Sequence, residues 1–307
     1  HYESWNGVRT MEFGVQFFPN IKPEEKSSAQ YFEECLKLCE LLDVYGYTHV
    51  RTVEHYFHVY GGYSPNPIVF LTAASQRTNK ARLVTGAVLP VFNNPLKIAG
   101  EIGMLDGISN GRLEVGLARA FIPREFEAFK IDLGESVERF DEGVEQIAKL
   151  LENENVTCDG KFHSFENITS FPRPLQKPRP QFWTAALSTE ESFEKAGRAG
   201  NWLMGIPIAG GKMKELLDIY RDAWVTAGHP GNGRIMLAFF MFCHEDHDEA
   251  IRIARTQVDN YFISLVDSAS GWTTGSVSND YRNYDKILAS LKKENLDTQI
   301  EKCSAWV

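Results

Sequence analysis

The chain has 307 residues and a formal net charge of −9 at pH 7, and its length suits one large α/β domain. The acidic residues are spread along the chain, which argues against a nucleic-acid-binding surface and against an anionic membrane as a partner. No apolar run approaches the roughly 20 residues that span a bilayer, and no signal-peptide pattern opens the chain, so we expect a cytoplasmic protein that acts on a small molecule.

Short strand patterns alternate with helical periods along residues 11–307, which we therefore expect to form a single domain. The predicted strands cover residues 11–18, 48–57, 81–89, 112–117, 182–186, 202–206 and 234–242. The predicted helices cover residues 29–45, 66–77, 95–108, 135–151, 189–199, 212–227 and 246–266. This alternation predicts an α/β fold with a parallel barrel or a parallel sheet.

Three segments stand outside the alternation. Residues 1–10 show no clear period and are expected to be an N-terminal arm or a cloning remnant. Residues 156–165, with Asp159-Gly160 at their centre, predict an inserted β-hairpin. Residues 267–280 are rich in Ser, Gly, Asn and Asp and predict a mobile polar loop. None of these segments marks a domain boundary.

The second predicted strand places polar residues at its end, where parallel α/β proteins gather their catalytic groups. A β-branched run that begins at Thr48 stops at Glu54 and His55. An imidazole at a strand end can donate or accept a proton near neutral pH, so His55 is the candidate catalytic residue, with a backbone-capping histidine as the alternative. Glu54 could orient the site or accept a hydrogen bond from a cofactor, and a salt-bridge or helix-capping role is its alternative.

Aromatic and histidine side chains follow directly after this strand. Four of them are expected to line a substrate pocket, although they could equally pack the loop against the fold: Tyr56, His58, Tyr60 and Tyr63. His55 and His58 are three positions apart, but no third ligand with a metal-binding spacing accompanies them. We therefore predict no metal site.

Four segments, in register over nearly the whole chain, carry a resemblance to a known family. They are Phe13-Gly-Val-Gln-Phe-Phe18, Glu54-His-Tyr-Phe57, Thr85-Gly-Ala-Val-Leu-Pro90 and the run from Leu105 to Arg119. With them, the chain resembles the bacterial luciferase-like, flavin-dependent monooxygenases. The resemblance implies a TIM-type (α/β)8 barrel that uses reduced FMN and O2 to oxygenate a small organic substrate through a peroxyflavin. It also implies a transient flavin reductase partner, which provides the reduced FMN.

The resemblance assigns roles to residues at matching positions. His55 stands where the family has its catalytic histidine. At Gly86-Ala87, next to Val88, the family often has a non-proline cis peptide that supports the flavin ring, and tight strand packing is the alternative reason for this glycine. At Arg119 the family binds the flavin phosphate with an arginine, for which a surface salt bridge is the alternative.

Two further phosphate contacts are predicted. Ser188 and Thr189 precede a predicted helix, whose free backbone N–H groups and positive dipole end favour a phosphate, although ordinary N-capping explains the same residues. Arg139, within the predicted helix 135–151, is assigned to the phosphate by the resemblance alone. Together with Glu54 and the segment around Ala87, these residues make up the predicted cofactor site.

The sequence departs from the family in three places. Members carry one more helix and an eighth strand after a Val-Gly-Thr-Pro-like turn, whereas this sequence ends at Val307, so we expect the eighth β/α unit to be missing. Ala118 stands where luciferase catalytic chains have a reactive cysteine, and Tyr56 stands where they have a second histidine. Both departures argue against long-chain aldehyde chemistry and light emission.

Two rival functions share this fold: a deazaflavin-dependent hydride-transfer oxidoreductase and a non-catalytic flavin-binding barrel subunit. The presence of both Glu54-His55 and Arg119 argues against the non-catalytic subunit. The family resemblance also predicts a homodimer. Apolar residues on two predicted helices favour the same assembly: Ile68, Leu71, Ala74, Ala99, Ile102 and Met104.

Overall fold

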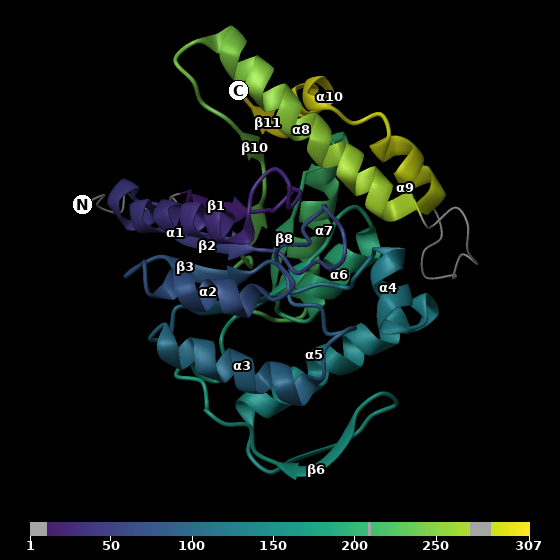
Figure 1. Ribbon diagram of the computed structural model, residues 1–307. Coiled ribbons are helices and arrows are strands. Elements are labelled where there is room, and N and C mark those ends of the chain that lie inside the picture. The colour runs from purple at the N-terminus through teal and green to yellow at the C-terminus, as the bar shows by residue number, and fades with distance from the viewer. Residues whose placement is uncertain (1–10, 208–209, 271–283) are drawn as a thin grey trace.

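The computed structural model describes residues 11–207, 210–270 and 284–307, and Figure 1 shows the element labels. Its centre is a sheet of seven parallel strands in the order β1-β2-β3-β4-β7-β8-β9. The strands are β1 (Gly14–Phe17), β2 (His49–Thr52), β3 (Arg82–Thr85), β4 (Leu113–Leu117), β7 (Phe182–Ala185), β8 (Trp202–Gly205) and β9 (Ile235–Leu237). The α/β fold and the parallel sheet are therefore as the sequence predicts.

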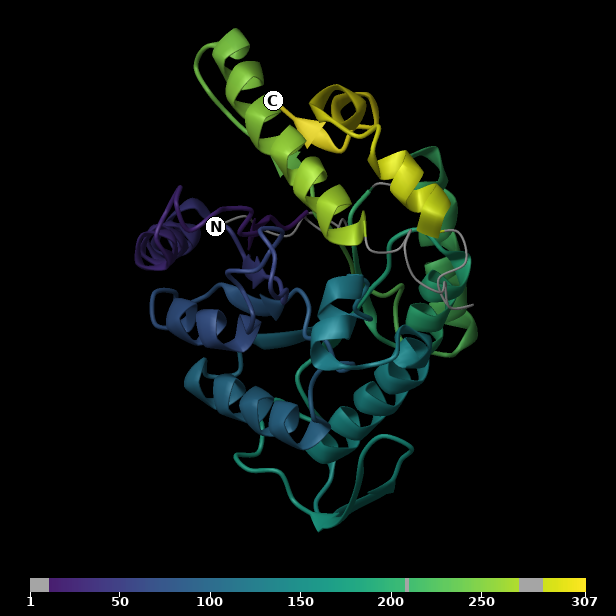
Figure 2. The same ribbon diagram turned by 45° about the vertical axis from the view of Figure 1, so that its right-hand side comes forward.

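Helices that connect these strands cover the outer face of the sheet (Figure 2). They are α1 (Ser28–Tyr45), α2 (Pro67–Ser75), α3 (Pro95–Ile108), α5 (Ser136–Glu152), α6 (Glu190–Arg198) and α7 (Met213–Thr226). Fully buried side chains such as Leu71, Ile102 and Ile147 on the helices share one apolar core with Val50 and Leu83 on the strands. Burial of this surface is what holds the helical layer on the sheet.

Asparagine and proline fix where two helices begin. The side chain of Asn66 accepts the backbone N–H groups of Ile68 and Val69, and Pro67 occupies the first helical position of α2. Asn94 and Pro95 start α3 in the same way. The N–H at the first position of a helix has no partner within the helix, so a proline there loses no hydrogen bond. Each Asn-Pro pair therefore marks where the loop after β2 or β3 ends and the next helix begins.

Side chains on the inner face of the curved sheet form an apolar layer and a polar group. The polar group lies nearer to the amino-terminal ends of the strands than the apolar layer does. The apolar layer includes Val84, Trp183, Met204 and Met236. In the polar group, the buried carboxylate of Glu114 forms an ion pair with Arg82 and accepts the indole N–H of Trp183 at 2.8 Å. The Nε2 atom of His49 lies 3.8 Å from the same carboxylate. The interior is thus filled with side chains, as in a barrel.

The two edge strands, β1 and β9, do not pair with each other within the described residues. The sheet nevertheless curves enough that Arg234, before β9, donates to Glu12, before β1, across 2.7 Å. The sequence prediction of seven strands in an unclosed barrel agrees with this arrangement.

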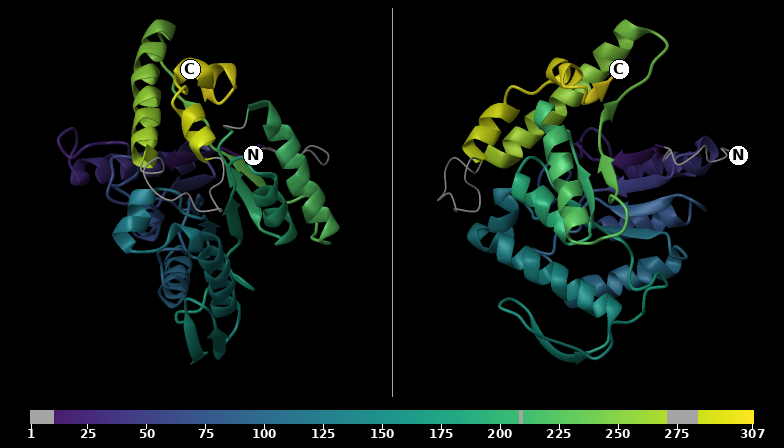
Figure 3. Two further views of the ribbon diagram at one scale, coloured as in Figure 1. Left: turned by 90° about the vertical axis from the view of Figure 1, so that its right-hand side faces the viewer. Right: turned by 180° about the vertical axis from the view of Figure 1, so that it is seen from behind.

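Four helices lie away from this outer layer. They are α4 (Pro123–Phe129), α8 (His247–Ala269), α9 (Tyr284–Leu291) and α10 (Leu296–Glu301). Figure 3 shows α8, α9 and α10 beyond one end of the sheet. The short helix α4, which the sequence pattern did not predict, contacts α8.

Two predicted elements need correction. The predicted strand 234–242 is two strands, because the chain leaves the sheet after β9 and its next strand, β10 (Phe240–Met241), pairs in parallel with β11 (Ala305–Trp306). The predicted loop 267–280 begins too early, since α8 continues through Ala269, which packs in an apolar cluster. The remainder of that loop lies outside the described residues, as does the predicted arm 1–10.

The predicted hairpin at 156–165 is confirmed. Strands β5 (Val156–Asp159) and β6 (Ser164–Ile168) pair antiparallel, and β6 extends three residues past the predicted end. Short 3₁₀ turns, η1 (Leu133–Glu135) and η2 (Gly210–Lys212), precede α5 and α7. None of the helices in the described part of the chain is both long and apolar enough to cross a bilayer.

Most of the apolar residues that favoured a dimer are buried in the core of this chain. Met104 has 57% of its surface exposed, but the others are buried: Ile68, Leu71, Ala74, Ala99 and Ile102. They were misassigned because both helices are apolar on most of their circumference, so the pattern does not show which face meets the sheet. The neighbouring Val69, 67% exposed, adds to the apolar surface that Met104 presents.

Candidate active site

The candidate site residues come together because β2, β3 and β4 are adjacent and parallel. Glu54 and His55 follow β2, Gly86 and Ala87 follow β3, and Arg119 follows β4. The carboxyl ends of parallel strands meet at one edge of a sheet, so these residues lie at the same end of the barrel. This is the arrangement that the sequence predicted.

His55 is buried and faces a carboxylate that the sequence analysis missed. Its Nδ1 atom lies 3.2 Å from Oε1 of Glu125 in α4, and the backbone N–H of Tyr56 donates to the same oxygen at 2.8 Å. When Nδ1 carries the ring proton, it donates to this oxygen. The other nitrogen, Nε2, is then the atom that can take up or release a proton toward the site.

Glu125 is fully buried, and its Oε2 atom has no hydrogen-bond partner among the described residues. Sequence reasoning missed it because it lies 70 positions from His55 on a helix of one to two turns, too short for a periodic signal. The proline at position 123, which opens α4, was the available sign of a helix start.

Aromatic rings surround the imidazole of His55. The ring centroids of Tyr60, Phe18 and Phe121 lie 5.1, 5.9 and 5.9 Å from that of His55. The hydroxyl of Tyr60 lies 3.0 Å from that of Tyr261 in α8, so this wall joins the barrel end to the helices beyond it. Such a wall keeps water away from the imidazole.

Glu54 is buried and holds the loop that follows β3. Its Oε1 accepts the hydroxyl of Tyr56 at 2.6 Å and the side-chain amide of Asn93 at 2.8 Å, and its Oε2 accepts the backbone N–H of Leu89 at 3.2 Å. Burial raises the pKa of Glu54 to about 7, although the hydrogen bonds from Tyr56 and Asn93 act to lower it. The structure thus gives Glu54 neither a salt bridge nor a helix cap.

The expected cis peptide between Gly86 and Ala87 is confirmed. Regular pairing of β3 ends at Thr85, and Val88 forms an isolated bridge with Leu117 at the end of β4. Gly86, Ala87 and Val88 are all buried, and the amide of Gly86 donates to the carbonyl of Thr52. The backbone here has almost no side-chain bulk, which suits close contact with a flat ring.

The predicted phosphate residues have different surroundings. Arg119 is half-buried, two positions past β4. Thr189 is the N-cap of α6 but makes no capping bond, because its hydroxyl pairs with that of Ser192; it and Ser188 are exposed. The first-turn N–H groups of α6 are therefore not capped by Thr189, as a phosphate site requires. All three assignments stay predictions.

Arg139 has protein partners. Its Nε donates to Glu135 at 2.9 Å, and its guanidinium lies 4.1 Å from the ring centroid of Phe162 in the β5–β6 turn. These contacts explain the position of Arg139 in the free protein, and its assignment to the phosphate stays a prediction.

Three of the predicted pocket residues have protein partners, and their assignment to a substrate pocket stays a prediction. The ring of Tyr56 packs on Phe129, and the hydroxyl of Tyr63 donates to the carbonyl of Lys26, just before α1. The Nε2 atom of His58 lies 3.1 Å from Asp267 in α8. Only Tyr60 of the predicted set touches His55 in the contacts that the structure gives. The described residues also contain no group of three or more side chains that could hold a metal ion.

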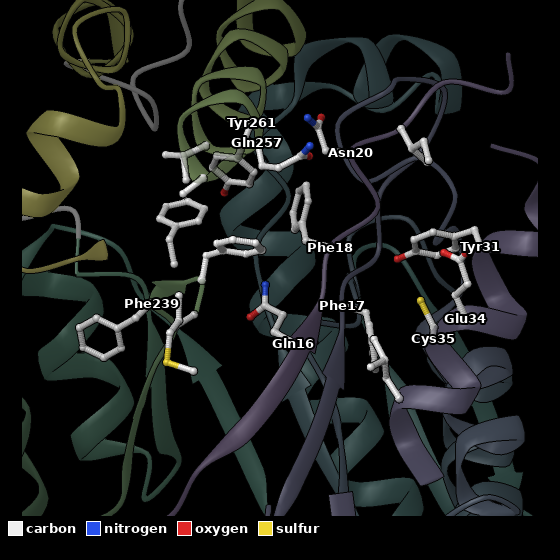
Figure 4. A pocket seen from close by; sticks show the side chains of 18 of the residues that line it. Gln16, Phe17, Phe18, Asn20, Tyr31, Glu34, Cys35, Phe239, Gln257 and Tyr261 are labelled. Atoms are coloured by element: carbon white, nitrogen blue, oxygen red, sulfur yellow. The ribbon is translucent and has the colours of Figure 1, made fainter. Parts of the chain in front are cut away.

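A cavity of about 530 Å³ opens beside this aromatic wall (Figure 4). It lies between β1, α1, the β9–β10 segment and α8, and Gln16, Phe18 and Tyr261 point into it. The ring of Phe18 lies between this cavity and His55, since it lines the cavity and also contacts the imidazole. The sequence analysis assigned these three residues to no pocket, because Gln16 lies in β1, Phe18 directly follows it, and Tyr261 belongs to a distant helix.

Comparison with known proteins decides the family. Residues 11–299 match the family model described as luciferase-like monooxygenase. The chain belongs to the luciferase-like monooxygenases. It is 34% identical over 259 residues to the oxygenase component of flavin-dependent trigonelline monooxygenase from Acinetobacter baylyi, covering 82% of this chain and 71% of that protein.

Solved structures agree with this assignment to the luciferase-like monooxygenases. The crystal structure of monooxygenase RslO1 from Streptomyces bottropensis superposes with a TM-score of 0.81 at 47% identity, covering 85% of this chain and 80% of that one. The oxygenating constituent of 3,6-diketocamphane monooxygenase from Pseudomonas putida, solved with FMN, shares the fold with a TM-score of 0.76 at 20% identity, covering 96% and 84%. Both proteins are named as monooxygenases, in agreement with the family of this chain.

Proposed function

We propose that this luciferase-like monooxygenase is the cytoplasmic oxygenase component of a two-component system. It binds reduced FMN across the carboxyl ends of β2, β3 and β4 and uses O2 to oxygenate a small organic substrate through a peroxyflavin. A separate flavin reductase provides the reduced FMN through transient contact. The A. baylyi relative named as an oxygenase component and the P. putida fold relative solved with FMN support the proposal.

The buried pair of His55 and Glu125 is the observation that carries the proposal. Reduced FMN, when bound, supplies the chemistry that activates O2. The chain has to control one proton and exclude water near that reaction. Glu125 holds the imidazole through Nδ1, which leaves Nε2 to handle the proton, and the rings of Phe18, Tyr60 and Phe121 exclude water.

The residues around this pair fit a flavin. The Gly86–Ala87 backbone offers a surface without bulky side chains for the flat ring. Arg119 would supply a cation for the phosphate, and the start of α6 after Ser188 and Thr189 would supply N–H groups that no side chain caps. Arg139 is a further phosphate contact if it leaves Glu135 on binding.

Neither rival function gains support. The relatives described above are named as monooxygenases, so hydride transfer with a deazaflavin is not favoured. A non-catalytic subunit would not need a buried carboxylate paired with His55, which is costly to bury.

The decisive test is anaerobic binding of reduced FMN followed by a pulse of O2. We expect stoichiometric binding of reduced FMN and then an absorbance transient of an oxygenated flavin, distinct from the spectrum of oxidised FMN. A parallel titration with reduced deazaflavin should show no binding. Tight binding of the deazaflavin in place of FMN would reverse the assignment, and binding of FMN without any transient would favour the non-catalytic subunit.

A further inference from the structure

Arg51 occupies an unusual place inside the barrel. It belongs to β2, where side chains alternate between the two faces of the sheet, and it points inward while Val50 joins the outer core. Its Nη1 atom lies 3.9 Å from the sulfur of Met236 in β9, a strand that does not pair with β2. Only 8% of the residue is exposed.

This buried guanidinium has no anionic partner among the described residues. Its Nε atom is buried without any acceptor. Among the described residues, the only hydrogen-bond acceptor for the guanidinium is the thioether sulfur of Met236, a weak acceptor that faces Nη1. Burial lowers the pKa of Arg51 to about 10, so the group still carries its charge at neutral pH. A buried charge without a partner is costly and is uncommon unless a ligand completes it.

Other arginines near the barrel interior are paired. Arg82 forms an ion pair with Glu114, and Arg234 donates to Glu12. Both of these arginines thus have a carboxylate partner within the protein. Arg51 is different, and its unmet charge faces the neighbourhood of the candidate site.

The side chain of Arg51 lies directly against the segment expected to support the flavin ring. A Cβ atom on Gly86 would lie 2.0 Å from Nε and 2.5 Å from Cγ of Arg51. The absence of a side chain at Gly86 is thus what admits the guanidinium beside the Gly86–Ala87 peptide. A planar anion held on that peptide would come within reach of the five donors of the guanidinium.

We propose that Arg51 is the charge partner of bound reduced FMN, and that its guanidinium donates to the negatively charged N1–C2=O edge of the flavin pyrimidine ring. The proposal rests on the proposed function. Reduced flavin carries this negative charge and oxidised flavin does not, so Arg51 favours the reduced form. A substrate carboxylate has the same planar, two-atom anion, but the contact with Gly86 favours the flavin.

The test compares the affinities for oxidised and reduced FMN with no substrate present. Arg51→Met puts an unbranched, uncharged side chain in place of the arginine, and Arg51→Lys keeps the charge. Arg234→Met, which removes an arginine already paired with Glu12, is the matched control. We expect Arg51→Met to weaken the binding of reduced FMN by about 10- to 100-fold, the effect of losing a charged hydrogen bond. The affinity for oxidised FMN should stay nearly unchanged.

Two further results are expected. Arg51→Lys should retain part of the preference for reduced FMN, and Arg234→Met should retain all of it. Without ligand, Arg51→Met should unfold at the same temperature as the parent or higher, since it removes an unpaired buried charge. A clear loss of unliganded stability would instead make Arg51 a structural residue and overturn the proposal.

The remaining outcomes separate this proposal from the proposed function. If the parent binds reduced FMN and Arg51→Met binds both redox forms as the parent does, the flavin role of Arg51 is wrong while the proposed function stands. If that variant also shows a raised KM for an acidic substrate, the anion belongs to the substrate. If the parent itself binds no reduced FMN, the proposed function fails as well.

Discussion

The Nδ1 atom of His55 lies 3.2 Å from Oε1 of Glu125, and the same oxygen accepts the backbone N–H of Tyr56 at 2.8 Å. One carboxylate oxygen therefore fixes both the imidazole and the backbone that follows it. His55 follows β2 and Glu125 belongs to α4, so the position of α4 on the barrel sets the position of His55. Glu125 is thus a positioning residue for the proposed proton transfer.

We expect Glu125→Ala to lower product formation by roughly 10- to 100-fold, less than removal of the general acid or base itself. The imidazole would lose the acceptor that selects its tautomer. Glu125→Gln keeps an acceptor oxygen and should lose less. Product and hydrogen peroxide, each measured per reduced FMN consumed, report the effect. Parent-like coupling in Glu125→Ala would show that His55 needs no carboxylate.

We expect His55→Asn to keep the fold and the affinity for reduced FMN, because the predicted phosphate contacts at Arg119 and Ser188 are separate from the imidazole. Product formation should fall by about 10²–10⁴, the usual range for loss of a general acid or base. Flavin oxidation should then release hydrogen peroxide in place of product. If His55→Asn turned over substrate at the parent rate with the same coupling, the histidine would be structural.

Glu54 should make stability depend on pH. Its pKa is raised from 4.5 to about 7 in the folded protein, chiefly by burial. The folded state therefore holds a proton that the unfolded state has lost between these pH values, so stability falls as pH rises from 4.5 to 7, by about 3 kcal/mol at most.

Glu54→Gln cannot titrate at this position and serves as the reference. Urea unfolding at pH 5 and pH 7.5 should show that the parent loses more stability over this interval than Glu54→Gln does. Other titrating groups contribute equally to both proteins and cancel in the comparison. Equal losses in the two proteins would mean that Glu54 is ionised in the folded state throughout.

The sequence predicted the barrel well because its signals are local. The Asn66-Pro67 and Asn94-Pro95 pairs mark helix starts, and a β-branched run that stops at Glu54 and His55 marks a strand end. Each of these features depends on residues within one turn or one strand of each other. The cis peptide at Gly86 was expected from the family resemblance and not from a local signal.

The features that the sequence did not reveal depend on contacts distant in sequence. Glu125 meets His55 only because α4 lies beside the residues that follow β2, and the hydroxyl of Tyr63 donates to Lys26, 37 positions away. Arg51 looks like an ordinary strand residue in the sequence, and only the curved sheet shows that its side chain is buried without a carboxylate partner among the described residues. A local pattern does not contain the partner of a buried charge.

We expect a homodimer formed through the exposed apolar side chains of α2 and α3. Val69 and Met104 are 67% and 57% exposed, and an apolar patch of this kind favours association. Light scattering should give twice the chain mass of 34.8 kDa. The double substitution Val69→Glu and Met104→Glu should give the monomer mass.

The matched control for the dimer is Val225→Glu on α7. It places a charge on a different helix, at a valine that is 57% exposed. It should leave the mass unchanged. A monomer mass for the parent at micromolar concentration would contradict the dimer, and an unchanged dimer after the double substitution would place the interface elsewhere.

Gly61 shapes the space that His55 occupies. Its φ is +76°, and a Cβ atom there would lie 2.6 Å from Cδ2 of His55. Gly46 has nearly the same φ, +77°, but nothing lies within 4 Å of its would-be Cβ. Both alanine variants have the same backbone cost, about 1–2 kcal/mol for a left-handed residue with a side chain.

Only Gly61→Ala should also displace the imidazole of His55 from Glu125. We therefore expect Gly46→Ala to lose stability alone, with product per reduced FMN unchanged. Gly61→Ala should lose more stability than Gly46→Ala and should release hydrogen peroxide in place of product, as His55→Asn does. Urea unfolding and the peroxide assay on the two variants separate backbone strain from displacement of the histidine. Equal stability and equal coupling in the two variants would mean that the loop yields and that His55 keeps its place without Gly61.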